Sequence, residues 1–88
     1  MLFMVIEHFK NRDPKPIGDR FRLEGRMMPD GVAYHASWID PEAVRCFQVM
    51  EADSVDKLRQ WATNWADLAD FEIVPVLTSQ AYWAGQPS

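Results

Sequence analysis

Short apolar runs separated by turn residues predict four β-strands. They cover residues 1–9, 32–39, 44–51 and 71–78. All four are rich in Val, Ile, Phe or Trp, which strands favour. The segment Asp40-Pro41-Glu42-Ala43 joins the second run to the third and has the composition of a type I turn, which predicts a hairpin. Pro75 predicts an edge position for the last strand, because proline cannot donate a ladder hydrogen bond.

Two segments with helical periodicity lie between these strands. In residues 16–28, spacings of four and seven place Ile17, Phe21 and Met28 on one side of a helix that Pro29 ends. The charged positions of that segment are expected toward water: Arg20, Arg22, Glu24 and Arg26. A second helix is capped by Asp53 or Ser54. Its apolar stripe is Leu58, Trp61, Ala62, Trp65, Leu68 and Ala69.

The resulting order is β-α-β-β-α-β, which predicts a ferredoxin-like α+β fold with a four-stranded antiparallel sheet and two helices on one face. Right-handed crossovers put the first and third strands in the centre and the fourth at an edge. We expect one domain over residues 1–79 and a loose tail over residues 80–88.

Both faces of this predicted sheet are apolar. In the first strand Leu2, Met4 and Ile6 point one way, while Phe3 and Val5 point the other. Two helices cover only one face, and an uncovered apolar face forfeits on the order of 10 kcal/mol of burial. The expected solution is a homodimer packed through its sheet faces, of the dimeric α/β-barrel type, with a pocket for a small hydrophobic ligand.

Charge and cysteine content narrow the function classes. The net charge of −4 disfavours nucleic-acid binding, because a negative field repels phosphate backbones. The single cysteine, Cys46, cannot form an internal disulfide, which favours a cytoplasmic location. The apolar start of the chain has no basic region before it and reaches Glu7 and His8 too early for a signal peptide or a membrane span.

Four stretches of the chain resemble a family of short bacterial proteins of unknown function, DUF3303. They are MLFMVIEHF, GRMMPDGVAYHASW, CFQVME and LRQWATNWADLADFEIVPVLTS, within residues 1–79. The resemblance implies a fold and a bacterial setting but no reaction. The layout is also similar in topology to the dimeric α/β-barrel group, which includes cofactor-free monooxygenases, muconolactone-isomerase-like enzymes, haem-degrading enzymes and binding proteins. Topology alone does not fix a function.

The hairpin groups the candidate site residues by face. A two-residue turn pairs Ile39 with Val44, which puts a mostly polar set on one face: His35, Ser37, Cys46, Gln48 and Met50. The other face then carries Tyr34, Trp38, Phe47 and Val49 and is expected to pack against the helices. The first face is the expected pocket lining, with Glu7 as a further member. A one-residue bulge would exchange the faces of one strand relative to the other.

Each candidate has a structural and a functional interpretation. Glu7 is an acid in an apolar strand, so it is either a proton-transfer group or a paired carboxylate. His35 is either a general base or a satisfied surface residue. Cys46 is interpreted as a small buried hydrophobic residue or as a nucleophile. Gln48 either hydrogen-bonds to its neighbours in the sheet or orients a ligand carbonyl. Trp38 and Trp65 are candidates for stacking on a ligand, although core packing explains them equally well.

No motif for a cofactor, metal or catalytic triad is present in the sequence, so we expect no cofactor and no metal site. Three functions stay open. The first is a small-ligand-binding or regulatory homodimer, the second a cofactor-independent monooxygenase- or isomerase-like enzyme, and the third a structural dimerisation module. A cavity larger than about 300 Å³ that holds Glu7 or His35 favours the first two.

Overall fold

Four antiparallel strands form an open sheet in the order β2-β3-β1-β4, as the sequence predicts. The structure is a computed structural model and describes residues 1–42 and 44–86. The strands are β1 (Leu2–Phe9), β2 (Val32–Ile39), β3 (Arg45–Ala52) and β4 (Ala69–Val76). β1 and β3 are central, and β4 lies at an edge, where Pro75 has a neighbouring strand on one side only.

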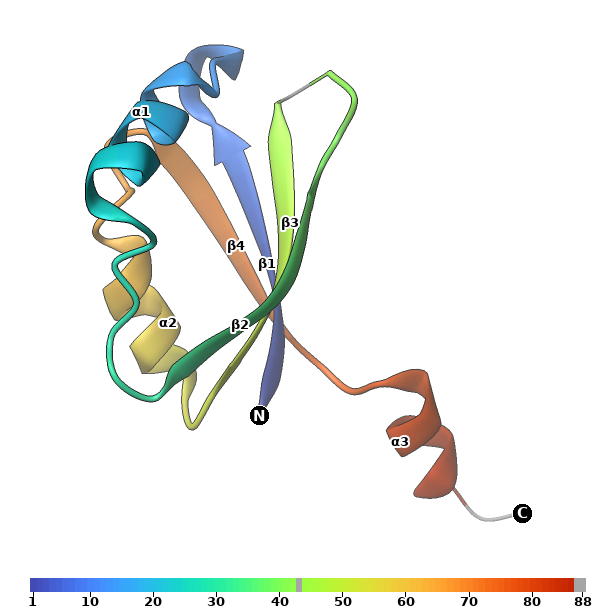
Figure 1. Ribbon diagram of the computed structural model, residues 1–88. Coiled ribbons are helices and arrows are strands. Elements are labelled where there is room, and N and C mark those ends of the chain that lie inside the picture. The colour runs from blue at the N-terminus through green and yellow to red at the C-terminus, as the bar shows by residue number, and fades with distance from the viewer. Residues whose placement is uncertain (43, 87–88) are drawn as a thin grey trace.

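Helices α1 (Lys15–Glu24) and α2 (Val55–Ala62) cover the same face of the sheet (Figure 1). The chain therefore has the ferredoxin-like βαββαβ order and an α+β fold, as predicted. Beneath the helices lie Phe3 and Val5 of β1, Met50 of β3 and Leu58 of α2, each at most 1% exposed. A short 3-10 turn, η1 (Lys10–Arg12), connects β1 to α1.

Both helices are shorter than the periodicity predicts. α1 ends at Gly25, whose φ of 68° lies in the left-handed region that glycine adopts without strain. Residues 25–28, which we expected in the helix, therefore lie beyond its end. Met27 and Met28 still pack against the core. After α2, successive i→i−3 bonds, such as Trp65 N–H to Ala62 O at 3.0 Å, keep Trp65 on the buried side without an α-helix.

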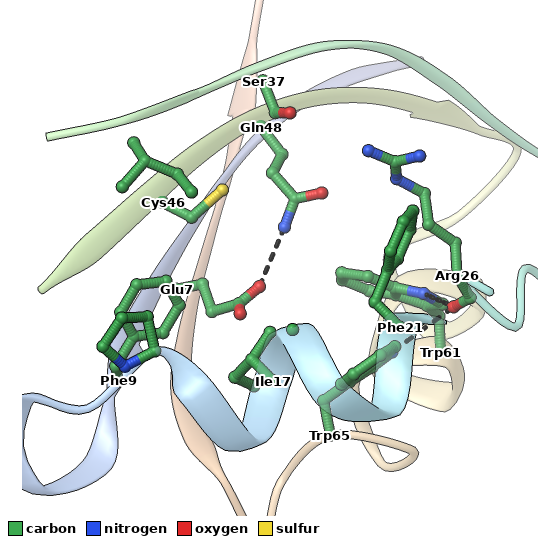
Figure 2. Close-up of a pocket in the computed structure, with 13 residues that line it drawn as sticks. Glu7, Phe9, Ile17, Phe21, Arg26, Ser37, Cys46, Gln48, Trp61 and Trp65 are labelled. Carbon is green, nitrogen blue, oxygen red and sulfur yellow. Dashed lines mark hydrogen bonds between the residues drawn. The ribbon is translucent and has the colours of Figure 1, made fainter. Parts of the chain in front are cut away.

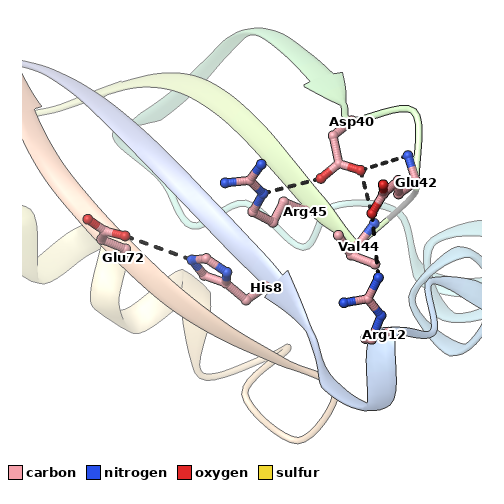
Figure 3. A network of polar contacts seen from close by, with 7 residues as sticks. All are labelled: His8, Arg12, Asp40, Glu42, Val44, Arg45 and Glu72. Carbon is pink, nitrogen blue, oxygen red and sulfur yellow. Dashed lines mark hydrogen bonds and ion pairs between the residues drawn. The ribbon is translucent and has the colours of Figure 1, made fainter.

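The β2–β3 hairpin has a longer turn than predicted and one irregularity in β2. Ile39 pairs with Cys46 rather than with Val44, and Asp40 accepts hydrogen bonds from Glu42 N–H and Val44 N–H within the turn (Figure 3). Ala43 lies outside the described residues. The register shifts between Tyr34 and Ala36, which is the bulge that the sequence left open.

Residues 79–84 form a short helix, whereas we expected a loose tail over residues 80–88. α3 (Ser79–Ala84) is capped by Thr78, whose hydroxyl accepts from Ala81 N–H at 3.0 Å. It projects from the end of β4 on the side of the sheet away from α1 and α2 (Figure 1). Its aromatic side chains, Tyr82 and Trp83, are exposed. Residues 87–88 lie outside the described part.

Candidate functional site

A pocket of about 360 Å³ lies between α1 and the helix-covered face of the sheet (Figure 2). The sheet contributes the floor through Glu7 and Phe9 of β1, Cys46 and Gln48 of β3, and Ser37 and Ile39 of β2. Ile17, Gly18 and Phe21 of α1 form the opposite wall, and Trp61 and Trp65 close one side. Apart from a few polar groups, the lining is apolar.

A buried pair of polar side chains sits on the pocket floor. Glu7 and Gln48 are each 5% exposed, and the amide Nε2 of Gln48 donates to a carboxylate oxygen of Glu7 at 2.9 Å. They come from adjacent central strands, where Glu7 lies opposite Cys46 and Val5 lies opposite Gln48. Burial raises the pKa of Glu7 from 4.5 to about 7, and the hydrogen bond from Gln48 opposes that rise. At neutral pH this carboxyl can both hold and release a proton.

Cys46 lines the pocket beside this pair. Burial raises the pKa of its thiol from 9.0 to about 11, and the nearby Glu7 carboxylate adds to the effect. A nucleophilic or metal-binding cysteine has its pKa lowered instead. The thiol is therefore protonated at neutral pH and forms a weakly polar part of the pocket wall. This agrees with the interpretation of Cys46 as a small buried hydrophobic residue.

Arg26 is a pocket residue that the sequence analysis placed in water. Its backbone carbonyl accepts hydrogen bonds from the indole N–H groups of Trp61 at 2.8 Å and Trp65 at 3.3 Å (Figure 2). Its guanidinium stacks on Tyr34, with 3.7 Å from the central carbon to the ring centroid. Two signals in the sequence could have indicated this position: Gly25 interrupts the predicted helix, and two buried indoles each need an acceptor.

The predicted pocket face is the face that the helices cover, which reverses one expectation. Ser37, Cys46, Gln48 and Met50 share a face as grouped, but this face packs under α1 and α2. Trp38, Phe47 and Val49, expected beneath the helices, lie on the open face. Glu7 and Gln48 can be buried on the covered face because they hydrogen-bond to each other there.

Two of the predicted site residues do not reach the pocket. The bulge turns His35 to the open face, where its Nε2 lies 2.9 Å from Glu51 Oε1, and puts Tyr34 on the covered face in its place. Trp38 is 58% exposed on the open face. Trp65 does line the pocket, together with Trp61. Of the predicted residues, the structure therefore brings together Glu7, Cys46, Gln48 and Trp65.

The open face carries an apolar area with charged side chains around it. The area consists of Leu2, Met4, Ile6, Phe47, Val49, Val74 and Val76. At one end the face carries His8, whose Nε2 is 3.8 Å from Glu72, and Arg45, which pairs with Asp40 at 3.2 Å (Figure 3). No helix within residues 1–42 and 44–86 is long and apolar enough to cross a membrane. Over the same described residues, no cluster of side chains could hold a metal ion.

The sequence of the chain also matches a known family. The model of the family described as domain of unknown function (DUF3303) matches residues 1–85, which include the pocket, the open face and α3. No curated protein matches the chain. Because the family match extends over nearly its whole length, the chain belongs to the DUF3303 family.

Proposed function

We propose that this protein is a homodimer that binds a small, largely apolar molecule in the pocket between α1 and the sheet. The observation that carries the proposal is a volume of about 360 Å³, with an apolar wall and a buried carboxyl–amide pair on its floor. Small-molecule sites typically have at least 300 Å³, an apolar lining and a few convergent polar groups. Glu7 and Gln48 supply those polar groups.

Ligand binding is tested with a neutral aromatic probe, 4-phenylbutanamide, followed by NMR of the indole N–H signals. Trp61 and Trp65 line the pocket, so their signals shift when it fills. Cys46→Leu places extra carbon in the pocket and is expected to weaken binding at least about tenfold. Gln60→Leu, an exposed position on α2, is the matched control and leaves affinity unchanged. The proposal is contradicted if neither this probe nor its carboxylate analogue, 4-phenylbutyrate, shifts these signals in the wild-type protein at millimolar concentration.

The dimer is proposed on the open face of the sheet. α1 and α2 shelter one face, while the apolar area defined above has no cover within the described residues. Contiguous exposed apolar areas of this kind typically mark interfaces. A second copy packed face to face buries both areas at once. Native mass spectrometry of the purified protein reads subunit number and any retained small molecule together, and a monomer at micromolar concentration contradicts this part of the proposal.

A cofactor-independent enzyme is the second candidate, favoured by one observation. Glu7 has a pKa of about 7 in an apolar pocket, which suits it to take a proton from a bound substrate and return it. His35 contributes nothing to that chemistry, because it lies on the other face. Glu7→Gln separates the two candidates: turnover is lost for an enzyme, whereas probe binding persists in both. We also propose a bacterial, cytoplasmic setting for the protein, which its single cysteine supports because it cannot form an internal disulfide.

A further inference from the structure

We propose that the pocket selects apolar ligands that carry a carboxylate, and that Arg26 binds this carboxylate. The inference rests on the proposed function and specifies the ligand class. Arg26 lines the pocket with its guanidinium directed toward the side of Gln48 (Figure 2). Neither the family match nor the sequence pattern assigns it a role.

The backbone around Arg26 is held in an unusual conformation. Gly25 and Met27 on either side have φ values of 68° and 58°, in the left-handed region that a non-glycine residue such as Met27 adopts only at a conformational cost. The two indole hydrogen bonds to the Arg26 carbonyl hold this turn in place. The segment that carries Arg26 is therefore fixed before any ligand arrives, as binding sites require.

The side chain of Arg26 is stacked but has no charged partner within residues 1–42 and 44–86. Its central carbon lies 3.7 Å from the Tyr34 ring centroid and 5.0 Å from that of Phe21. Stacking occupies the faces of the guanidinium and leaves its in-plane N–H donors available. Each of the other five arginines lies within 4.0 Å of a carboxylate: Arg12, Arg20, Arg22, Arg45 and Arg59.

The other polar groups of the pocket already have partners. Glu7 accepts from Gln48, and the hydroxyls of Ser37 and Tyr34 lie 2.5 Å apart. A ligand carboxylate would give Arg26 the bidentate charge-assisted bonds that the protein does not supply there. Glu7 is the carboxyl among the lining residues, and because burial raises its pKa to about 7, it is largely uncharged at pH 6 and does not repel such a ligand.

The test compares 4-phenylbutyrate with its neutral amide, 4-phenylbutanamide, at pH 6. Dissociation constants come from the indole N–H signals of Trp61 and Trp65 in three proteins: wild type, Arg26→Gln and Arg22→Gln. Arg22 is an exposed arginine on α1, so its variant makes the same charge change outside the pocket. We expect the carboxylate to bind at least about tenfold more tightly than the amide to wild type and Arg22→Gln, with the preference lost in Arg26→Gln.

The outcomes separate this inference from the proposed function. If wild type binds both probes equally, or Arg26→Gln keeps the preference, Arg26 is not the carboxylate site while ligand binding itself stands. If neither probe shifts the indole signals of the wild-type protein, the proposed function fails and the inference fails with it. Should Arg26→Gln not fold, the comparison of the two probes on wild type still decides whether the pocket prefers a carboxylate.

Discussion

Glu7 is the residue where burial and chemistry conflict most directly. A carboxyl on a central strand, 5% exposed, has one protein hydrogen bond to support its charged form, from Gln48. Burial therefore favours the protonated acid, and the folded chain keeps a proton that the unfolded chain releases. The same property makes Glu7 useful in a pocket, because it can donate a hydrogen bond to a ligand as well as accept one.

This property predicts a pH-dependent stability. The folded pKa of about 7 lies above the unfolded value of 4.5, so the stability that Glu7 provides at low pH is lost as pH rises through this window. The free energy of unfolding of Glu7→Gln, relative to that of wild type, should therefore rise by about 2 to 3 kcal/mol as the pH is raised from 5 to 8. Urea unfolding at fixed protein concentration measures this difference. Glu24→Gln, at an exposed position on α1, is the control and should follow the wild-type profile. Parallel profiles for wild type and Glu7→Gln would refute the assignment.

Cys46 gives a second test at the residue scale. With a pKa near 11 instead of 9.0, the thiolate fraction at pH 8 falls about 100-fold. Alkylation by iodoacetamide, followed by mass spectrometry, should thus be at least about 100-fold slower in the folded protein than in urea. The chain has a single cysteine, so the rate belongs to this residue. Equal rates in the two states would mean that Cys46 is an accessible, reactive thiol.

At the scale of the element, two glycines of the α1 region have opposite roles. Gly18 lies within the helix, and a methyl group there would meet only the Arg22 side chain, at 3.9 Å. Gly18→Ala should stabilise the protein by about 0.5 to 1 kcal/mol. Gly25 also has open space around it, but its φ of 68° with ψ of −161° favours glycine alone, so Gly25→Ala should cost about 1 to 3 kcal/mol.

Urea unfolding of the two variants checks this pair. Both changes add the same methyl group and neither creates a clash, so the difference between them measures the backbone conformation alone. Because the turn at Gly25 also positions Arg26, Gly25→Ala should in addition weaken binding of 4-phenylbutyrate. Equal stability of the two variants would show that the turn after α1 does not require a left-handed residue.

The elements were predictable from the sequence to different degrees. Strand order follows from the apolar runs, the crossover rule and Pro75, and the structure has that order. That Ser37, Cys46 and Gln48 share one face was also predictable, because strand residues alternate, although the predicted pairing of Ile39 with Val44 was wrong. The bulge at His35 was not, since a one-residue irregularity leaves no periodic signal in Tyr34-His35-Ala36.

The pocket was predictable only in part for a related reason. Glu7 and Gln48 were expected to lie together, but their polarity suggested the uncovered face. Two polar side chains can be buried when they hydrogen-bond to each other. Such a bond depends on which two strands are neighbours, so neither sequence segment shows it alone. Arg26 was missed because its role depends on a helix that ends early at Gly25 and on two indoles more than thirty residues away.

At the scale of the whole molecule, the sheet divides the protein into a covered side and an open side. The covered side contains the pocket, and the open side contains the apolar area that includes Met4, Phe47 and Val74. α3 extends from β4 away from α1 and α2, and a helix of six residues is marginal without packing partners. Both the open face and α3 thus expose apolar side chains in the single chain. The proposed dimer would cover them with a second copy.

A charge on the open face provides the decisive variant. Val74 lies beside Met4 within the apolar area and is 37% exposed in the single chain, so Val74→Glu should leave the fold intact. In a face-to-face dimer each of the two copies would bury one such carboxylate in the interface, so association should weaken at least about 100-fold. Leu23 is 86% exposed on α1, so Leu23→Glu makes a similar change away from the interface and should remain dimeric. Sedimentation velocity measures the association, and circular dichroism checks that each variant is folded. A Val74→Glu protein that dimerises as wild type does would place the interface elsewhere, and a monomeric wild type would leave the open face exposed to water and refute the dimer.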